Sequence, residues 1–300
     1  MILSTLRTLF HTKLAALYSE REVDAIFFAY IYDKYGIRKY EYFLNAQKHE
    51  GTKARRHEGT KGEWEKDLEE LSNGCPLQYV LGKTVFYGLT LEVNPAVLIP
   101  RPETEELVEV VCSKFKVQSS KFNVQSSILP IRVLDVGTGS GAIAIALAKN
   151  IKNAEVWATD ISELALENAQ KNASTNNVTI QFLHHDILKD DITMLPSNLD
   201  VIVSNPPYIP CGEQINLHKN VVQYEPHEAL FVPDKNPLVF YDAITNVAIK
   251  NLRKGGILFF ETHEKFHLEL SVMFATKGFK EIKLWNDLNG NPRFASGKKL

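Results

Sequence analysis

The sequence has few cysteines and lacks any long apolar run. Its 300 residues include three cysteines, Cys75, Cys112 and Cys211, without the Cys-x-x-Cys spacing of zinc or redox sites. Scattered cysteines of this kind favour reduced thiols and a cytoplasmic location. No apolar stretch approaches the roughly 18 residues that suggest a transmembrane helix, so we expect no membrane-embedded segment.

A surplus of basic residues is missing too. The chain has 34 lysines and arginines against 36 acidic residues, for a formal net charge of −2. Domains that grip nucleic acid through its phosphates are usually basic. The charge balance therefore argues against direct nucleic-acid binding without excluding a local basic patch. The composition is otherwise that of an ordinary globular chain, whose length suggests two domains.

The N-terminal quarter of the chain has the apolar spacing of helices and no strand pattern. Apolar residues from Ile2 to Leu17 recur at helical intervals, and a second run follows from Val23 to Ile31. The absence of acidic residues before Glu20 is also typical of an organelle transit peptide. We favour the first helix of a helical domain, predicted to cover residues 1–76.

The sequence contains two short tandem repeats, the first of which lies within this helical segment. The pentamer HEGTK occurs at residues 49–53 and again at 57–61, and a KF(K/N)VQSS repeat fills residues 114–127. Repeats of true solenoid proteins have periods of about 20 residues or more. We therefore interpret both repeats as expansions of surface loops, where added length costs little stability.

Strand and helix patterns alternate over most of the remaining sequence. Residues 84–99 predict two strands with a turn at Gly88 or at Asn94-Pro95, so residues 77–100 are expected to form a β-hairpin linker. Further strands separated by helices favour an α/β fold, with a mostly parallel sheet covered by helices on both faces. These predicted strands are residues 132–137, 154–160, 178–186, 199–205, 255–262, 279–285 and 293–300.

A glycine-rich loop joins the first of these strands to a helix. The segment VLDVGTGSGAIAIALA places Gly137, Gly139 and Gly141 at the turn, with Thr138 and Ser140 between them. Glycine permits tight turns and lets a ligand approach the backbone, and the helix N-terminus offers free N–H groups. The pattern is neither the dinucleotide fingerprint GxGxxG nor a P-loop, because no Gly-Lys-Ser/Thr follows. We expect a nucleoside ligand without a pyrophosphate group.

Acidic residues end the next two predicted strands. Asp160 comes about 20 residues after the glycine loop, where a carboxylate can accept hydrogen bonds from two ribose hydroxyls. Asp186 ends the following strand, and the carboxyl ends of parallel strands line the usual ligand site of such folds. Helix capping is the competing explanation for Asp160, since Ser162 and a predicted helix follow directly.

The motif Asn-Pro-Pro-Tyr follows the fourth predicted strand, at Asn205–Tyr208. The prolines fix φ and stiffen the loop. The Asn205 side-chain oxygen and the Pro206 carbonyl can accept hydrogen bonds, and the Tyr208 ring offers a flat face. These groups suit a planar NH₂ group, whose nitrogen is a poor nucleophile while its lone pair is delocalised. A carboxamide, adenine N6 and guanine N2 all carry such a group.

The chain resembles the S-adenosylmethionine-dependent methyltransferases of the seven-stranded, Rossmann-like class, and among them the family that methylates glutamine in peptide chain release factors. The resemblance covers most of the sequence. It implies transfer of a methyl group to the side-chain amide nitrogen (N5) of the glutamine in the GGQ motif, with S-adenosylhomocysteine as the second product. The stretches that carry it are PLQYVLGKTVFYGLTLEVNPAVLIPRPETEELV, VLDVGTGSGAIAIALA, TDISELALENAQKN, VSNPPYIP and YEPHEAL.

The resemblance also implies residue roles. The helical domain would bind a class I release factor, and residues 101–300 would form the methyltransferase domain of a cytoplasmic monomer without a metal. Glu225 would brace the substrate loop. The cofactor would be held by Gly137, Thr138, Gly139, Ser140, Gly141, Asp160, Asp186, Ile187 and Asn205. The glutamine would be bound by Asn205, Pro206, Pro207 and Tyr208. The expected catalytic residues are Asn205, Pro206 and Tyr208.

Two stretches depart from the usual pattern of this family. FVPDKNPLVFY follows YEPHEAL in place of a glycine-rich step, and ETHEKFH stands where Glu-Ile-Gly is common. His263 and His267 have the i, i+4 spacing of a metal pair, but no third ligand is evident.

Two other functions stay open. One is a nucleic-acid methyltransferase acting on adenine N6 or guanine N2, and the other is an adaptor that retains a nucleoside fold without activity. A DNA base methyltransferase would normally need a basic target-recognition module, which the sequence lacks. The adaptor is disfavoured because the glycine loop and the Asn-Pro-Pro-Tyr motif are both intact.

Overall fold

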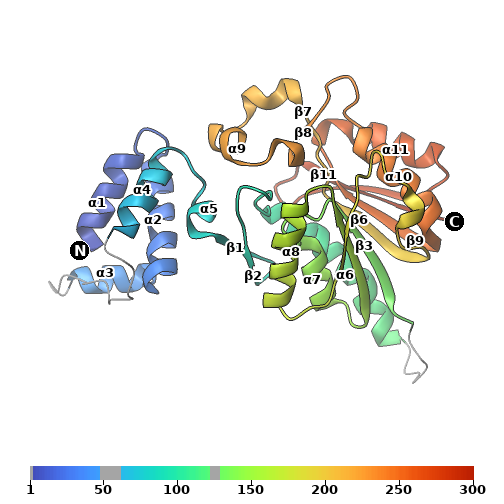
Figure 1. Cartoon of the computed structure of the whole chain (residues 1–300), viewed down its shortest axis with the longest axis horizontal. Coiled ribbons are helices and arrows are strands. Elements are labelled where there is room, and N and C mark those ends of the chain that lie inside the picture. Colours follow the sequence, from blue (N-terminus) through green and yellow to red (C-terminus); the bar gives the residue numbers. More distant parts are fainter. Residues whose placement is uncertain (1–2, 48–61, 122–128) are drawn as a thin grey trace. The chain divides into compact units, whose positions relative to one another are not determined.

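The computed structural model describes residues 3–47, 62–121 and 129–300. The chain forms two compact units (Figure 1). One unit comprises residues 1–82 and 218–224, and the other comprises residues 83–217 and 225–300.

The first unit is helical. Its helix α2 begins with a capping box, in which Ser19 and Glu22 each bond the other's backbone N–H, and ends at Gly36 in the left-handed conformation. Phe10 of α1 and Phe27 of α2 pack edge to face in the core of this unit. The helices are α1 (Leu3–Leu14), α2 (Glu20–Tyr35), α3 (Lys39–Gln47), α4 (Glu63–Ser72), α5 (Leu77–Leu81) and α9 (Lys219–Tyr224).

Helix α9 joins this unit although it lies far along the chain. The rings of Tyr18 and His218 stack with centroids 6.1 Å apart, and the Asn220 amide donates to the Tyr18 hydroxyl. The Tyr224 hydroxyl donates to the Asn73 carbonyl at 3.0 Å. The structure therefore groups α5 and α9 with the helical unit, whereas the sequence analysis placed them in the linker and in the methyltransferase domain.

The second unit is built on a seven-stranded sheet. The strand order is β10-β11-β9-β6-β3-β4-β5, and every strand is parallel to the others except β11, which runs antiparallel to both neighbours. This confirms the predicted α/β fold class. The strands are β3 (Ile131–Val136), β4 (Ala154–Asp160), β5 (Gln181–His184), β6 (Leu199–Ser204), β9 (Leu252–Glu261), β10 (Lys280–Asn286) and β11 (Pro292–Lys298).

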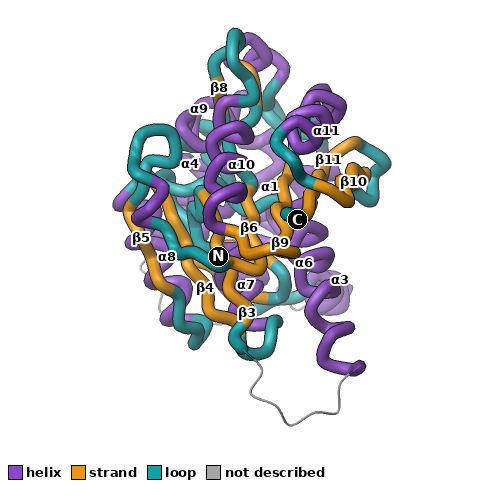
Figure 2. Tube along the Cα trace, turned by 90° about the vertical axis from the view of Figure 1, so that its right-hand side faces the viewer, coloured by secondary structure: helices purple, strands orange, loops and turns teal. Residues whose placement is uncertain are grey.

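Helices cover both faces of this sheet, as predicted. Successive side chains of a strand point to opposite faces, so Val133 packs in the core under α6 and α7, whereas Leu134 packs in the core under α10 and α11. Figure 2 shows α10 lying over the sheet. No helix in the described part of the chain is long and apolar enough to cross a membrane. The helices of this unit are α6 (Pro102–Lys121), α7 (Ala142–Asn150), α8 (Glu163–Thr175), α10 (Val239–Asn251) and α11 (His267–Thr276).

A β-hairpin, β1 (Lys83–Phe86) and β2 (Leu89–Glu92), also belongs to the second unit. Its turn is Tyr87-Gly88, and both residues have positive φ (48° and 74°), as a tight two-residue turn of this type requires. Of the two turns considered from the sequence, the one at Gly88 is therefore correct.

The side chain of Asn172 on α8 holds this hairpin in place. Its Oδ1 accepts from the Glu92 N–H at 2.6 Å, and its Nδ2 donates to the Glu92 carbonyl at 2.9 Å. The same Nδ2 donates to the Ser140 carbonyl, also at 2.9 Å. One buried amide thus links the hairpin to the glycine-rich loop.

Three details differ from the sequence expectations. Strand β5 is shorter than predicted and stops at His184, because its neighbour β4 ends at the paired residue Asp160. Residues 114–121 continue α6 instead of forming a surface loop. The HEGTK repeats and residues 122–127 lie outside the described residues. The third difference is a pair of short strands that no pattern predicted, β7 (Ile209–Pro210) and β8 (Phe231–Val232).

Replacing Asn172 with alanine is expected to lower the free energy of unfolding by about 1–3 kcal/mol, because the Ser140 carbonyl and the Glu92 backbone lose their partner. Urea denaturation measures the change. Asn176→Ala, one helical turn further along α8, is the matched control, since Asn176 bonds the Thr90 carbonyl at an exposed position. Equal losses in the two variants would contradict the role assigned to Asn172.

Candidate active site

The carboxyl ends of four neighbouring strands reach one level of the sheet. Register partners in β4, β3, β6 and β9 are Thr159, Val136, Ser204 and Phe260. The residues that come next in the chain are Asp160, Gly137, Asn205 and Glu261. Because adjacent strands lie about 5 Å apart, these four residues follow one another along the same edge, where ligands bind in open α/β sheets.

The glycine loop crosses this edge between β3 and α7. The N–H groups of Gly137 and Thr138 both donate to the Thr159 carbonyl at 2.9 Å, which fixes the start of the loop. A Cβ atom built on Gly137 or Gly139 would meet nothing within 4 Å, so the backbone there is open to a ligand. Gly141 serves packing instead, since a Cβ there would lie 3.1 Å from the Ala169 side chain.

A buried carboxylate, Asp135, lies beneath the loop. Its Oδ2 accepts from the Thr138 hydroxyl at 2.7 Å and from the Ala144 N–H at 3.2 Å. Its Oδ1 is buried and has no hydrogen-bond partner among the described residues. Burial raises the pKa of Asp135 to about 7, against the lowering effect of the two hydrogen bonds. No role was predicted for this residue from the sequence.

Asp160 is tied to the glycine loop. Its Oδ2 accepts from the Gly139 N–H at 2.8 Å, and its Oδ1 accepts from the Ser162 N–H at 3.0 Å. Burial raises the pKa of Asp160, although its backbone N–H donors oppose the shift. The N-cap of α8 is Ser162, whose hydroxyl accepts from the Ala165 N–H. The capping explanation for Asp160 is therefore wrong.

Asp186 and Ile187 follow β5 at the far end of the row. The intervening His185 donates its N–H to the Asp160 carbonyl at 3.0 Å, which keeps this segment beside β4. Partial burial alone would raise the pKa of Asp186, but an ion pair with Lys189 at 2.9 Å and other donors hold it below its ordinary value. Ile187 is partly buried against the core under α10.

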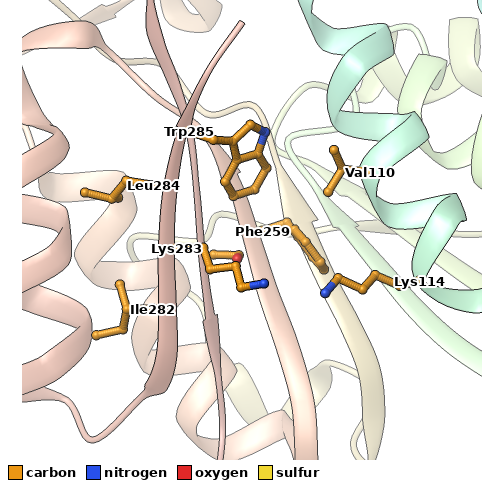
Figure 3. Close-up of a pocket in the computed structure, with 8 residues that line it drawn as sticks. Val110, Lys114, Phe259, Ile282, Lys283, Leu284 and Trp285 are labelled. Atoms are coloured by element: carbon orange, nitrogen blue, oxygen red, sulfur yellow. The ribbon is translucent and has the colours of Figure 1, made fainter.

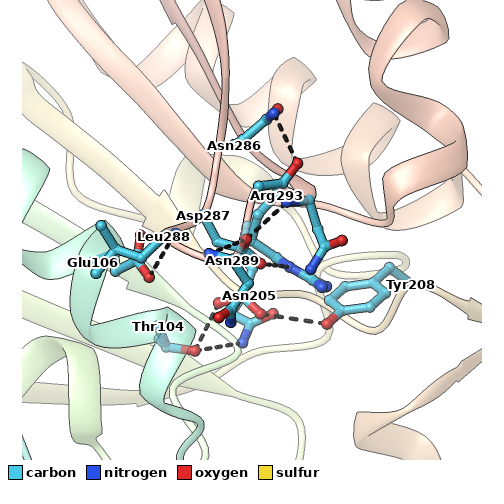
Figure 4. Close-up of polar contacts among 12 residues, drawn as sticks. Thr104, Glu106, Asn205, Tyr208, Asn286, Asp287, Leu288, Asn289 and Arg293 are labelled. Atoms are coloured by element: carbon cyan, nitrogen blue, oxygen red, sulfur yellow. Dashed lines mark hydrogen bonds and ion pairs between the residues drawn. The ribbon is translucent and has the colours of Figure 1, made fainter.

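The Asn-Pro-Pro-Tyr motif is anchored through two of its side chains (Figure 4). The Asn205 Nδ2 donates to the Thr104 hydroxyl oxygen at 3.2 Å, and the Tyr208 hydroxyl donates to Glu261 Oε1 at 3.3 Å. Within the described part of the chain, the Asn205 Oδ1 makes no side-chain hydrogen bond. Pro206 is buried and Pro207 is half-buried, so the loop that carries the motif is packed rather than free.

Glu261 is the centre of this network, and no role was predicted for it from the sequence. It is 1% exposed and its Oε2 accepts from the Thr104 hydroxyl at 2.6 Å. Burial raises the pKa of Glu261 to about 7, while Thr104 and the positive charge of Arg293 lower it. The Arg293 Nε is 3.4 Å from Asp287 Oδ2. An acidic residue that ends an apolar strand, in FFE, was the available signal.

Glu225 joins two separate stretches of the second unit. It is buried, and its carboxylate accepts from the Ile99 N–H at 3.2 Å and from the Arg101 guanidinium at 2.6 Å. A charged hydrogen bond of this kind fixes the chain that leads into α6. Glu225 therefore holds the segment that delivers Thr104 to Asn205.

A cavity of about 460 Å³ lies elsewhere, between α6 and β10 (Figure 3). Val110, Lys114, Phe259 and Trp285 line it with other residues of the sheet, and none of the predicted site residues does.

The histidine pair considered from the sequence does not form a metal site. The Nε2 of His263 is 3.4 Å from Glu213 Oε2, and its Nδ1 accepts from the Lys265 N–H, so both ring nitrogens have partners within the protein. The described residues contain no cluster of three or more His, Cys, Asp or Glu side chains suited to a metal ion.

Comparison with known proteins points to methyl transfer. The family model described as "Methyltransferase small domain" matches residues 119–226. A curated release factor glutamine methyltransferase of Flavobacterium psychrophilum is 40% identical over 98% of both chains. The protein of the same name from Bacteroides thetaiotaomicron is 37% identical over 79% of this chain and 81% of its own.

Solved structures agree on the fold. The hMettl16 catalytic domain, solved in complex with MAT2A 3′UTR hairpin 6, is 17% identical and aligns over 71% of this chain and 76% of its own, with a TM-score of 0.52. The Thermus thermophilus 16S rRNA N2 G1207 methyltransferase, solved with AdoMet and guanosine, is 22% identical over 73% of this chain and 50% of its own, with a TM-score of 0.50. Because one relative is 40% identical over 98% of both chains and the fold is that of a methyltransferase, the chain belongs to the release factor glutamine methyltransferase family.

Proposed function

We propose that this protein transfers the methyl group of S-adenosylmethionine to the side-chain amide nitrogen of a glutamine in a peptide chain release factor. The observation that carries the proposal is the orientation of Asn205. Its amide nitrogen donates to Thr104, which leaves its oxygen to accept, and Asn205 follows β6 at the level where Gly137 follows β3. The similarity to a release factor glutamine methyltransferase over 98% of both chains supports the same reaction.

The chemical difficulty of the reaction explains why acceptors are needed. An amide nitrogen shares its lone pair with the carbonyl and must localise it to attack carbon. Acceptors on both N–H bonds favour that change and stabilise the positive charge that develops on nitrogen. The Asn205 side-chain oxygen and the Pro206 carbonyl are the two acceptors in this proposal, with Pro207 stiffening the loop and the Tyr208 ring packing against the planar amide. The methylated amide then loses its extra proton to water.

The residues around the glycine loop suit the cofactor, whose sulfonium supplies an electrophilic methyl group. The open backbone at Gly137 and Gly139 allows close approach, and Thr138, Ser140 and Gly141 complete the loop. We assign Asp160 to the ribose hydroxyls, and Asp186 with Ile187 to the adenine. The buried Asp135 oxygen that has no hydrogen-bond partner among the described residues is a further acceptor next to the loop. These assignments are proposals that rest on donor and acceptor chemistry.

A class I release factor is the proposed partner, so the reaction takes place in the cytoplasm. The helical unit is the proposed docking region for it, because the 40% identical relative covers that part of the chain as well. The alternative of a nucleic-acid amino-methyltransferase is not favoured. The relatives that match 98% and 79% of the chain both carry the release factor name, and the likeness to RNA methyltransferases is a likeness of fold.

Purified protein with methyl-labelled S-adenosylmethionine should label a class I release factor taken from cells that lack such a transferase. A release factor with its GGQ glutamine replaced by alanine should take up no label. Transfer RNA, ribosomal RNA and DNA are assayed in parallel. Label on nucleic acid alone would refute the proposal, and cofactor binding without any transfer would count against it.

Asn205→Ala should lower kcat by about 10²–10³-fold, the effect of losing one aligned acceptor, while the dissociation constant for S-adenosylmethionine changes little. Single-turnover kinetics and calorimetry measure the two quantities. Asn246→Ala, on the outer side of α10, is the control and should leave both unchanged. Comparable losses of binding and turnover in Asn205→Ala would assign this residue to the cofactor instead.

Asp160→Ala should weaken S-adenosylmethionine binding by roughly tenfold to a hundredfold, since hydrogen bonds to a charged group contribute about 1.5–3 kcal/mol. Calorimetry with the cofactor product provides a second value without turnover. Glu155→Ala, at the opposite end of β4, removes a carboxylate from the same strand and should leave affinity unaltered. Unchanged affinity in Asp160→Ala would exclude its ribose role.

A further inference from the structure

A buried hydrogen-bond chain lies behind the Asn-Pro-Pro-Tyr motif. The Thr104 hydroxyl oxygen is 2.6 Å from Glu261 Oε2 and 3.2 Å from the Asn205 Nδ2 (Figure 4). Thr104 is 4% exposed and Glu261 is 1% exposed, so neither exchanges partners with bulk water. The proposed reaction uses Asn205 directly but assigns no task to the two residues behind it.

The direction of each hydrogen bond in this chain follows from the groups present. An ionised carboxylate only accepts, so the single hydroxyl proton of Thr104 goes to Glu261. The Thr104 oxygen is then left as an acceptor. Of the two ends of the Asn205 amide, the NH₂ end alone can donate to it. The carbonyl end is thereby left for another partner.

We propose that Glu261 and Thr104 are positioning residues that determine which end of the Asn205 amide faces the substrate. The inference rests on the proposed function, in which the Asn205 oxygen accepts from the substrate NH₂ group. A half-turn of the amide would bring its own NH₂ group against that of the substrate, and two donors cannot bond each other. Glu261 thus selects the reactive orientation without touching the substrate.

Proton uptake by Glu261 would reverse this selection. The pKa of Glu261 is raised by burial to about 7. A protonated Glu261 donates to Thr104, whose own hydroxyl proton then turns toward Asn205 and favours its carbonyl end. The reactive orientation is therefore held above this pKa and lost as the pH falls through it.

Several other charged or titratable groups face Glu261. Glu103 of α6 raises its pKa, while Arg293 of β11 lowers it. Tyr208 donates to Oε1 at 3.3 Å, and Tyr241 of α10 donates to the Glu261 backbone carbonyl at 3.2 Å. The two tyrosine hydroxyls bond Oε1 and the backbone carbonyl, so Oε2 is left to receive the Thr104 proton.

Steady-state kinetics at saturating cofactor tests the inference. Thr104→Val, which keeps the shape but removes the hydroxyl, should lower kcat by roughly tenfold to a hundredfold, the cost of misplacing an aligning group. Thr104→Ser should restore most of the activity. The affinity for S-adenosylmethionine should stay constant in both. Thr245→Val, at a buried threonine on α10, controls for the substitution itself.

The pH dependence of kcat separates positioning from a packing role. In the wild-type protein kcat should fall about tenfold for each pH unit below the Glu261 pKa. In Glu261→Gln this acidic limb should disappear, because the amide does not titrate. An acidic limb that persists in Glu261→Gln belongs to another group and overturns the inference, as does full activity of Thr104→Val.

A spectroscopic measurement keeps the test independent of methyl transfer. In protein labelled with ¹⁵N-asparagine, the Asn205 side-chain NH₂ signal can be assigned by its absence in Asn205→Asp. Its chemical shift should titrate together with Glu261 and should lose that titration in Glu261→Gln and Thr104→Val. A signal that ignores both substitutions refutes the inference even if the release factor is methylated. A titrating signal without methylation refutes the proposed function alone.

Discussion

The common level of the strand ends is the constraint on which this site depends. In a parallel sheet the backbone hydrogen bonds fix register, and here they align the last or next-to-last residues of β4, β3, β6 and β9. The glycine loop, Asn205 and Glu261 are therefore brought to one edge by main-chain geometry before any side chain packs. Side chains then refine the arrangement. Asn172 holds the β1–β2 hairpin in place, and Glu225 holds the segment that leads into α6.

Burial of carboxylates accompanies this alignment. Asp135, Asp160 and Glu261 all end or nearly end a strand, and burial raises the pKa of each. Shifts of this kind concentrate at functional sites because a dry, charged environment suits catalysis better than stability. In Asp135 one oxygen accepts hydrogen bonds, and the other has no partner within the described part of the chain. In Glu261 both oxygens accept from hydroxyl groups. The first arrangement leaves one buried acceptor unused among the described residues, whereas the second is complete within the protein.

Much of this could be predicted from sequence, and the parts that could not have a physical reason. The apolar strand patterns, the glycine loop and the Asn-Pro-Pro-Tyr motif are local, so periodicity and turn chemistry revealed them. Thr104, Asn205 and Glu261 meet across 101 and 157 residues of chain, and no local pattern encodes such a meeting. Strand β5 stopped early because its partner strand ended there. Helix α9 was missed because six residues carry too little periodicity to identify a helix.

The membership of α9 in the helical unit affects how separable that unit is. The backbone passes between the two units after Gly82, again after Leu217, and once more after Tyr224. A deletion of the first 82 residues would therefore leave behind a fragment of their fold, with His218 and Asn220 stripped of Tyr18. Recombination between relatives that exchanged only the amino-terminal segment would join mismatched halves of one core. Inheritance of the amino-terminal helices is thus coupled to a short stretch of sequence more than 130 residues downstream.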